Sequence, residues 1–344
     1  MKNVYKIVLL VLIFGGLLNA QSGASADRIS KVGTTAGQFL KIGVSARALA
    51  MGSAFTSVAN DVSSIYWNPA GLSRVNAHEA MFTHVEWIAN TSYDFGALTI
   101  HMGDDGALGL MVSSFSSGDM AVTTVEQPDG TGEYFSAQFI AAGISYSRDL
   151  TDKFSIGFTG KFVSETIWHM SASALALDVG TLFTTPIWGI QLGATISNFG
   201  SKMKLEGRDT RFAYDPLPNQ DGPVEIVNSG YEMLEYSLPL RFQVGISKDL
   251  EINEYNRLTI AADAIQPNDN YESVNTGFEY AWKEMFFLRA GYKSLFQEDS
   301  EEGMTLGMGA NIRLAGTTQI RVDYAYADMN RLENAQKFSL AIRF

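Results

Sequence analysis

The sequence contains no cysteine, and it contains no long apolar run beyond the one near its start. Without cysteine, an exported chain has no disulfides, so a long hydrogen-bonded ladder has to hold it together instead. The apolar run at 7–18 follows Lys2 and Lys6. It is shorter than the roughly 20 residues that a membrane-spanning helix needs. We therefore interpret residues 1–20 as a cleaved signal peptide and expect no transmembrane helix.

Basic residues are also scarce. The chain has 25 Lys and Arg against 37 Asp and Glu, a net charge of −12, which argues against a nucleic-acid partner. Its histidines (His78, His84, His101 and His169) lack the close spacing of metal ligands, and no G-x-S-x-G nucleophile motif is present. We expect no metal, no cofactor and no enzymatic activity.

What the chain does have is strict alternation, most clearly in its last ten residues. One face carries Phe338, Leu340, Ile342 and Phe344, and the other carries Lys337, Ser339, Ala341 and Arg343. A period of two suits a strand of about 9 to 11 residues that crosses a bilayer at a tilt. The same pattern recurs at 317–327, 303–314, 285–293 and 240–247, always without charge on the apolar face. Because Lys or Arg facing lipid costs about 2 to 4 kcal/mol, this exclusion favours a membrane barrel over a soluble sandwich.

Extending the pattern predicts an all-β fold, a transmembrane antiparallel β-barrel of about 14 strands in a bacterial outer membrane. The expected strands are 78–88, 91–101, 106–115, 136–148, 153–165, 171–184, 189–198, 239–248, 256–265, 273–282, 285–294, 303–314, 317–327 and 335–344. Their connections are mostly short at one end and long at the other, as periplasmic turns and external loops are. The first hairpin, at 89–90, departs from this rule. An even strand number places both chain ends on the periplasmic side.

The segment at 45–73 differs in composition from the rest of the chain. It is rich in Ala, Gly and Ser, and its apolar and polar residues do not alternate. Small residues allow close backbone approach, so this segment suits packing inside a barrel lumen. Asn68 followed by Pro69 predicts the start of a short helix, with Asn as the cap and Pro in the first turn. The predicted domains are the signal peptide 1–20, a plug at 21–77 and the barrel at 78–344.

The motifs SARALAMGSAF at 45–55 and NPAGL at 68–72 resemble those of the PorV/PorQ family of outer-membrane proteins, within the wider FadL-like barrel superfamily. The resemblance implies a fourteen-stranded barrel with the N-terminal segment lodged in its lumen. PorV-like members serve the type IX secretion system and bind secreted cargo proteins. FadL-like members pass long-chain fatty acids and other hydrophobic compounds inward, and the NPA-containing segment forms part of their gate.

Three sets of residues are candidates for function. The plug and gate candidates are Arg47, Met51, Gly52, Asn68, Pro69, Ala70, Gly71 and Leu72, which alternatively only cap helices and fill space. The expected lumen-lining residues are Arg241, Asp263, Arg289, Arg313, Arg321, Asp323 and Arg343, which either line an aqueous path or brace a filled barrel with salt bridges. The terminal Phe344 resembles the signal by which outer-membrane proteins reach their insertion machinery.

Two functions remain open at this stage. The first is a secretion-associated component that binds exported proteins and secretion-system subunits, and the alternative is a transporter of a hydrophobic small molecule. Both would contact outer-membrane lipid. A transporter should contain an apolar pocket that continues to a gap in the wall or plug, whereas a protein-binding barrel should expose an apolar patch among its external loops.

Overall fold

The computed structural model describes residues 31–216, 226–297, 300–314, 316–332 and 334–344. The predicted signal peptide 1–20 lies outside the described residues. The chain separates into the units Met1–Lys31 and Val32–Phe344, and the fold below is that of the second unit. None of the described helices is long and apolar enough to cross a membrane.

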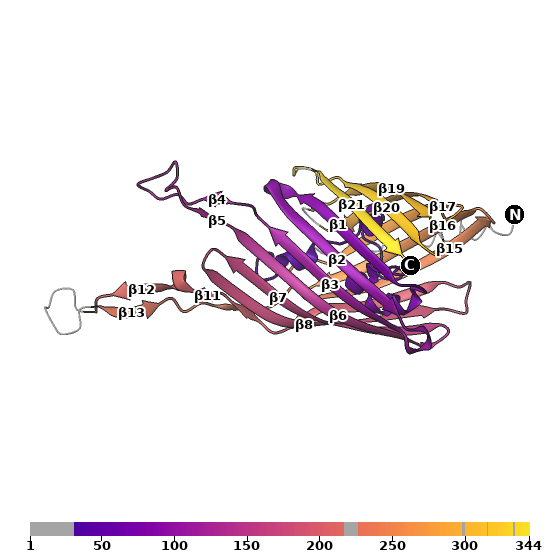
Figure 1. Ribbon diagram of the computed structural model, residues 1–344, viewed down its shortest axis with the longest axis horizontal. Coiled ribbons are helices and arrows are strands. Elements are labelled where there is room, and N and C mark those ends of the chain that lie inside the picture. The colour runs from indigo at the N-terminus through magenta and orange to yellow at the C-terminus, as the bar shows by residue number, and fades with distance from the viewer. Residues whose placement is uncertain (1–30, 217–225, 298–299, 315, 333) are drawn as a thin grey trace, which may run out of the picture. The chain divides into compact units, whose positions relative to one another are not determined.

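Within the described residues, fourteen antiparallel strands form a closed barrel (Figure 1). They are β1 (Glu79–Trp87), β2 (Thr91–His101), β3 (Ala107–Ser116), β6 (Ala137–Thr151), β7 (Phe154–Ile167), β8 (Met170–Thr184), β9 (Gln191–Gly200), β15 (Arg241–Asn253), β16 (Asn256–Pro267), β17 (Ser273–Trp282), β18 (Phe286–Leu295), β19 (Met304–Arg313), β20 (Gln319–Ala327) and β21 (Ala335–Arg343). Pairing of β1 with β21 and of β8 with β9 closes the ring. The predicted fold class is confirmed.

The alternation in the sequence translates into two chemically different faces. On β21, Phe338, Leu340 and Ile342 face outward and are exposed, while Lys337 and Ser339 face inward and are buried. Side chains of a strand point alternately to opposite faces, so one register decides the whole row. Exposed Leu, Ile, Val and Phe rows on the outer face form the surface that lipid tails would cover.

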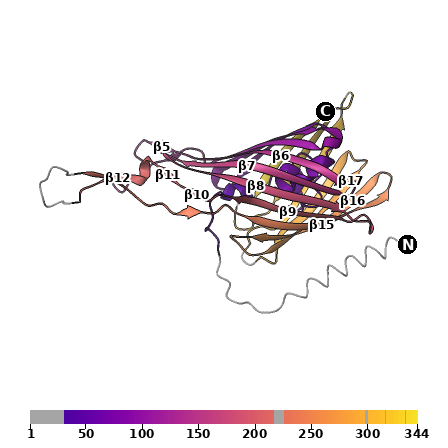
Figure 2. The same ribbon diagram turned by 90° about the horizontal axis from the view of Figure 1, so that it is seen from below.

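The two ends of the barrel differ in their connections. At the short-turn end, Asp152 and Lys153 alone connect β6 to β7, and the C-terminal Phe344 donates its backbone N–H to the carbonyl of His78, 3.0 Å away. The long-loop end carries the connection between β9 and β15, which we call the arm (201–216 and 226–240). The arm contains β10 (Met203–Lys204), β11 (Glu206–Gly207), η5 (Arg208–Thr210), β12 (Arg211–Tyr214), β13 (Val227–Gly230) and β14 (Glu235–Tyr236). Its β12–β13 hairpin stands clear of the barrel strands (Figures 1 and 2).

Residues 32–77, which we call the plug, fill the lumen. Their helical elements are η1 (Gln38–Lys41), α2 (Ala46–Ala50), α3 (Ser64–Trp67) and η2 (Pro69–Arg74). Every residue from 45 to 73 is buried except Asn60. The plug begins at the long-loop end, where Ala36 donates to the carbonyl of Ser237 at 3.0 Å, and it leaves at the short-turn end to enter β1. The start of β1 and the end of β21 both lie at the short-turn end, as an even number of strands requires, whereas the first described plug residues lie at the opposite end.

Three cross-strand pairs of glycines let the plug backbone touch the wall. The pairs are Gly157 with Gly180, Gly193 with Gly245, and Gly277 with Gly291. A Cβ atom at Gly291 would lie 2.1 Å from the backbone N of Gly52, and one at Gly277 would lie 2.2 Å from the carbonyl O of Met51. Both distances are far below van der Waals contact. The glycines are therefore the places where the wall admits another backbone.

The lipid-facing row of β21 gives a first prediction. Leu340 is 44% exposed and pairs with Phe82 and Val322 on the flanking strands. Leu340→Arg should lower the free energy of unfolding in lipid vesicles by about 2 to 4 kcal/mol, because the guanidinium would face hydrocarbon. Gln336→Arg, in the same row but at the strand end, should cost about 1 kcal/mol or less. Equal costs at both positions would contradict an outward face that lies in lipid.

The glycine pairs give a second prediction. Gly291→Ala should destabilise the barrel by about 3 kcal/mol, the upper range of overpacking, because its methyl group would meet the Gly52 backbone. The matched control is Gly160→Ala in β7, where a Cβ atom would have no neighbour within 4 Å. Urea titration in vesicles measures both changes. A Gly291→Ala protein as stable as Gly160→Ala would mean that the plug does not press against this wall.

Candidate functional site: the plug and its charged contacts

The NPAGL element fixes the plug to one side of the wall. The Asn68 side chain accepts a hydrogen bond from the N–H of Ala70 at 3.2 Å, so it caps η2 as predicted. Its amide group also donates to two carbonyls, that of Thr56 within the plug at 2.8 Å and that of Thr181 on β8 at 3.0 Å. Pro69 occupies the first turn of η2, and Gly157 and Gly180 leave room for Asn68 and Pro69. Asn68 thus joins helix, plug and wall.

The rest of the element serves close packing. Ala70 and Leu72 are completely buried, and a Cβ atom at Gly71 would lie 2.4 Å from the carbonyl O of Ala59. On the other side of the lumen, Met51 is buried and Gly52 has a φ of +62°, a left-handed conformation that glycine adopts without strain. The Gly52 N–H donates to the Thr305 hydroxyl of β19 at 3.0 Å. These contacts favour a structural role for the motif.

Buried charges connect the plug to the opposite wall. Arg47 of α2 lies beside Glu279 of β17, with its Nε 2.9 Å from Oε2, and beside Asp61 of the plug at 2.9 Å. The Nε of Arg289, on β18, lies 2.7 Å from the same Glu279 Oε2, and its Nη1 lies 2.6 Å from Asp323 on β20. Glu279 is fully buried and shared by three arginines, because Arg257 of β16 also lies near it, with its Nη2 3.2 Å from Oε1. Such a cluster fixes one arrangement of plug and wall.

Asp61 is the plug's own carboxylate in this cluster. Arg321 of β20 and Arg47 both lie 2.9 Å from its Oδ2. Burial alone would raise the pKa of Asp61, but the guanidinium groups of Arg321 and Arg47 outweigh it and hold the pKa well below the ordinary value. A depressed pKa means that this contribution to stability is complete above the ordinary carboxyl pKa of about 3.9 and is lost only as the pH falls below it.

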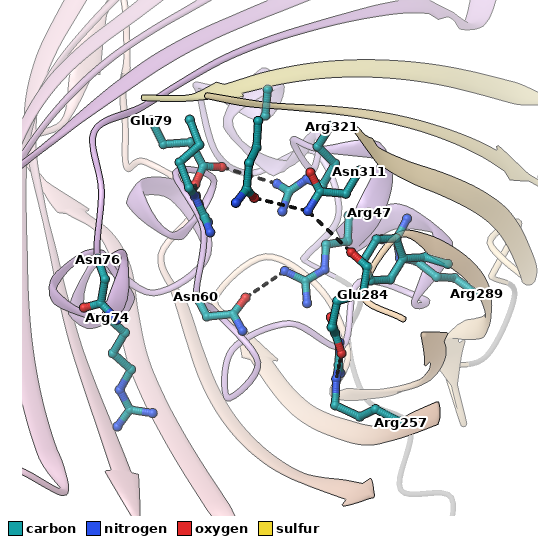
Figure 3. Close-up of a pocket in the computed structure, with 14 residues that line it drawn as sticks. Arg47, Asn60, Arg74, Asn76, Glu79, Arg257, Glu284, Arg289, Asn311 and Arg321 are labelled. Atoms are coloured by element: carbon teal, nitrogen blue, oxygen red, sulfur yellow. Dashed lines mark hydrogen bonds and ion pairs between the residues drawn. The ribbon is translucent and has the colours of Figure 1, made fainter. Parts of the chain in front are cut away.

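A polar cavity of about 290 Å³ opens beside this cluster at the short-turn end (Figure 3). Its lining residues are Arg47, Asn60, Arg74, Asn76, Glu79, Arg257, Glu284, Phe287, Arg289, Asn311, Gln319, Arg321, Ala341 and Arg343. Asn60, the one exposed residue of 45–73, accepts a hydrogen bond from Arg47 here at 2.7 Å. Five of the six arginines pair with carboxylates, as Arg257 does with Glu284 at 2.7 Å, and Arg74 donates instead to Ser155 and Gln191. A lining of this kind suits water and ions rather than an apolar solute.

The predicted lumen residues divide between two regions. Arg289, Arg321, Asp323 and Arg343 meet in the charged cluster and its cavity, where Arg343 lies 2.7 Å from its register partner Glu79. Asp263 lies elsewhere in the lumen and accepts the N–H groups of Phe55 and Thr56, each at 2.9 Å. The guanidinium of Arg241 lies 5.7 Å from the centre of the Tyr66 ring. Arg313 is exposed at the end of β19, and Phe344 is exposed at the chain end.

Four charged residues of the cluster were missing from the sequence prediction. Glu79, Arg257 and Glu279 lie on strands, and alternation alone places Glu279 inward, between the outward Phe278 and Tyr280. That signal was present in the predicted strand 273–282. Asp61 carries no comparable signal, because the plug does not alternate and its path through the lumen decides which wall each side chain meets.

The shared carboxylate gives a third prediction. Glu279→Gln should lower the free energy of unfolding by about 3 to 5 kcal/mol, because it leaves Arg47 and Arg289 buried with too little negative charge. Glu284→Gln is the matched control, since Glu284 is 55% exposed and an exposed pair is worth about 1 kcal/mol or less. Chemical denaturation of both variants measures the difference. A loss for Glu279→Gln no larger than for Glu284→Gln would show that the cluster does not hold the plug.

Comparison with known proteins finds solved structures with a similar fold but no protein with a matching sequence. No protein-family model matches the chain, and no curated protein matches it. The fold is similar to that of the Pseudomonas putida toluene transporter TodX, with 13% identity, 88% of this chain and 97% of that chain covered, and a TM-score of 0.53. It is also similar to CymD, a monoaromatic hydrocarbon channel, with 11% identity, 88% and 97% coverage, and a TM-score of 0.54.

At these identities the likeness concerns the fold. It agrees with the closed ring of fourteen strands and with the rows of exposed Leu, Ile, Val and Phe side chains on the outer face. The chain is a bacterial outer-membrane β-barrel whose fold is similar to that of TodX and CymD.

Proposed function

We propose that this barrel does no chemistry and binds exported proteins at its long-loop end, as a component of type IX secretion. The observation that carries the proposal is the combination of a filled lumen with an arm that exposes apolar side chains. The sequence resemblance to the PorV/PorQ family supports the same role.

The lumen offers poor conditions for an apolar solute. The plug is buried along 45–73, and glycine pairs bring its backbone against the wall on several strands. Next to it, a buried ion cluster ties α2 to β17, β18 and β20. The cavity at the short-turn end is lined mainly by arginines, carboxylates and amides. Transport would require the chain to break these contacts and desolvate charges along the path.

The arm, by contrast, presents apolar groups to the outside. Each of the following arm residues has at least 40% of its surface exposed: Phe212, Tyr214, Ile226, Val227, Tyr231, Leu234 and Tyr236. The rings of Phe212 and Tyr231 lie 4.9 Å apart, centre to centre. Contiguous exposed apolar groups of this kind mark interaction surfaces, and aromatic residues dominate the binding energy of such surfaces.

The arm also offers backbone hydrogen bonds. Within the described residues, β12 and β13 pair only with each other, so the hairpin has two strand edges without a neighbour. An edge of this kind accepts a further strand, whose backbone supplies affinity while side-chain pockets supply specificity. A β-rich domain of an exported protein fits this edge, and PorV-like members, which the sequence resembles, bind secreted cargo proteins.

Transport of a hydrophobic compound is the second candidate, and the fold likeness to TodX and CymD favours it. In this case the plug is the gate, and Arg47, Met51, Gly52 and 68–72 are the residues that have to move. The two candidates place the functional surface at different sites, the arm and the lumen, and separate experiments reach each of them.

The arm gives a fourth prediction. In the native organism, Phe212→Ser combined with Tyr231→Ser should reduce the amount of exported protein in the medium at least tenfold, because it removes two aromatic anchors. Tyr255→Ser, which alters a 51% exposed tyrosine at the short-turn end, should leave secretion unchanged. Quantitative proteomics of medium and periplasm measures both, with the barrel's level in the outer membrane as the control for folding.

Deletion of the gene separates the two candidates. Loss of secreted proteins with normal uptake of labelled fatty acid and toluene would support the first candidate. Loss of uptake with normal secretion would support the second and reject the first. Normal secretion and normal uptake would reject both.

A further inference from the structure

A second cavity, of about 270 Å³, lies at the long-loop end, and none of its described lining residues belongs to the plug or to the arm. We call it the aromatic cleft. Its lining residues are Asp119, Tyr134, Phe135, Ser136, Gln138, Thr166 and Trp168, from the loop that contains β4 (Met120–Ala121) and β5 (Tyr134–Phe135) and from the adjoining ends of β6 and β7. Three aromatic rings thus share one hollow with a carboxylate, an amide and three hydroxyl groups, one of them the hydroxyl of Tyr134.

The register of the strands places this cleft on the outside of the barrel, above its apolar band. Gln138 pairs with Thr166 and comes one residue before the inward Phe139 of β6, which packs on Phe39 of the plug. Going from the cleft toward the short-turn end, the outward side chains on β7 change from Thr166 and Ser164 to Phe162 and Phe158. The cleft therefore lies at the level where lipid headgroups begin.

Trp168 is held in this cleft by a strained backbone. It belongs to the two-residue turn between β7 and β8 and has a φ of +53°, which glycine or asparagine adopts easily and a tryptophan rarely does. Its N–H donates to the carbonyl of Ser136 at 3.1 Å, and its ring lies 6.0 Å from that of Phe135. Glycine or asparagine would fit this turn without backbone strain, but neither has an aromatic ring. Backbone strain that the surrounding structure maintains is typical of a functional position.

The chemistry of the lining is that of a site for a sugar. A pyranose ring has an apolar C–H face, which stacks on an aromatic ring, and a rim of hydroxyl groups, which need donors and acceptors. Trp168 remains 40% exposed and Tyr134 remains 67% exposed, so both rings have surface free for stacking. Asp119, Gln138 and Thr166 supply the polar groups around them.

We propose that the aromatic cleft binds a sugar ring, carried either by the headgroup of an outer-leaflet glycolipid or by a free saccharide. The alternative explanation of Trp168 is that it only anchors the barrel at the bilayer surface, as interfacial tryptophans commonly do. Such an anchor would need no cavity beside it. The cleft adds an open hollow with hydrogen-bonding side chains in its lining, and its place just above the apolar band is where the sugars of a glycolipid lie. This site is independent of protein binding by the arm.

The test uses the full-length barrel in a detergent without a sugar headgroup, because alkyl glycosides would compete. The two probes are rough lipopolysaccharide and the oligosaccharide released from it by mild acid, and native mass spectrometry measures the bound fraction of each. Trp168→Asn removes the ring and suits the positive φ, so it should fold normally while its apparent affinity falls about tenfold. Asp119→Asn should weaken binding several-fold.

The matched control is Trp188→Asn at the opposite end of the barrel, where Trp188 also has a positive φ, of +57°, and is 54% exposed. This variant should bind within twofold of the unmodified protein. Binding of both probes supports the proposal and identifies the sugar itself as the ligand, whereas binding of lipopolysaccharide alone supports it with a glycolipid as the source. The proposal is overturned if the unmodified barrel binds neither probe, if Trp168→Asn binds as well as it does, or if Trp188→Asn loses as much.

Discussion

The constraint on which the structure depends is that a bilayer offers no hydrogen-bond partner to a peptide group. A sheet in lipid must therefore close on itself, since an open edge would leave a row of N–H and C=O groups without partners. Here the closure depends on the pairing of β1 with β21, which is reinforced at its end by Glu79 and its register partner Arg343. Closure also explains how the chain is held together without disulfides, because every strand of the closed ring is hydrogen-bonded to a neighbour on both sides.

Closure creates a second requirement, which is to fill the space inside. The inner face of this barrel carries polar and small side chains together with apolar ones such as Phe95 and Met111, and the plug packs against both kinds. Asp263 finds its donors in the backbone of Phe55 and Thr56, and Thr305 receives the N–H of Gly52. Polar groups that would be unsatisfied in an empty, dry lumen are satisfied by a second backbone. The glycine pairs allow that backbone to come close enough.

The sequence predicted the strands far better than it predicted the charged cluster, and the reason is physical. A strand's alternation is local, so Phe338 to Phe344 disclose an outward face without any knowledge of neighbouring strands. The capping of η2 by Asn68 is local too, and it was predicted correctly. The meeting of Arg47, Asp61 and Glu279 is not local, because their chain separations are large and the plug's path has no periodic signal. Arg313, predicted by the same alternation as Arg289, is exposed because it lies where β19 ends.

The buried ion cluster also bears on which surface acts. Burying ion pairs contributes little net stability, because desolvation offsets most of the attraction, but separating the partners is costly. A network that ties one helix of the plug to three strands therefore selects a single closed arrangement and opposes any other. A barrel with a plug fixed in this way is a rigid support for its loops. The loops are the part of the molecule that can vary in sequence and conformation. Two features without a structural explanation lie in the loops, namely the exposed apolar side chains of the arm and Trp168, which has a positive φ in the turn between β7 and β8.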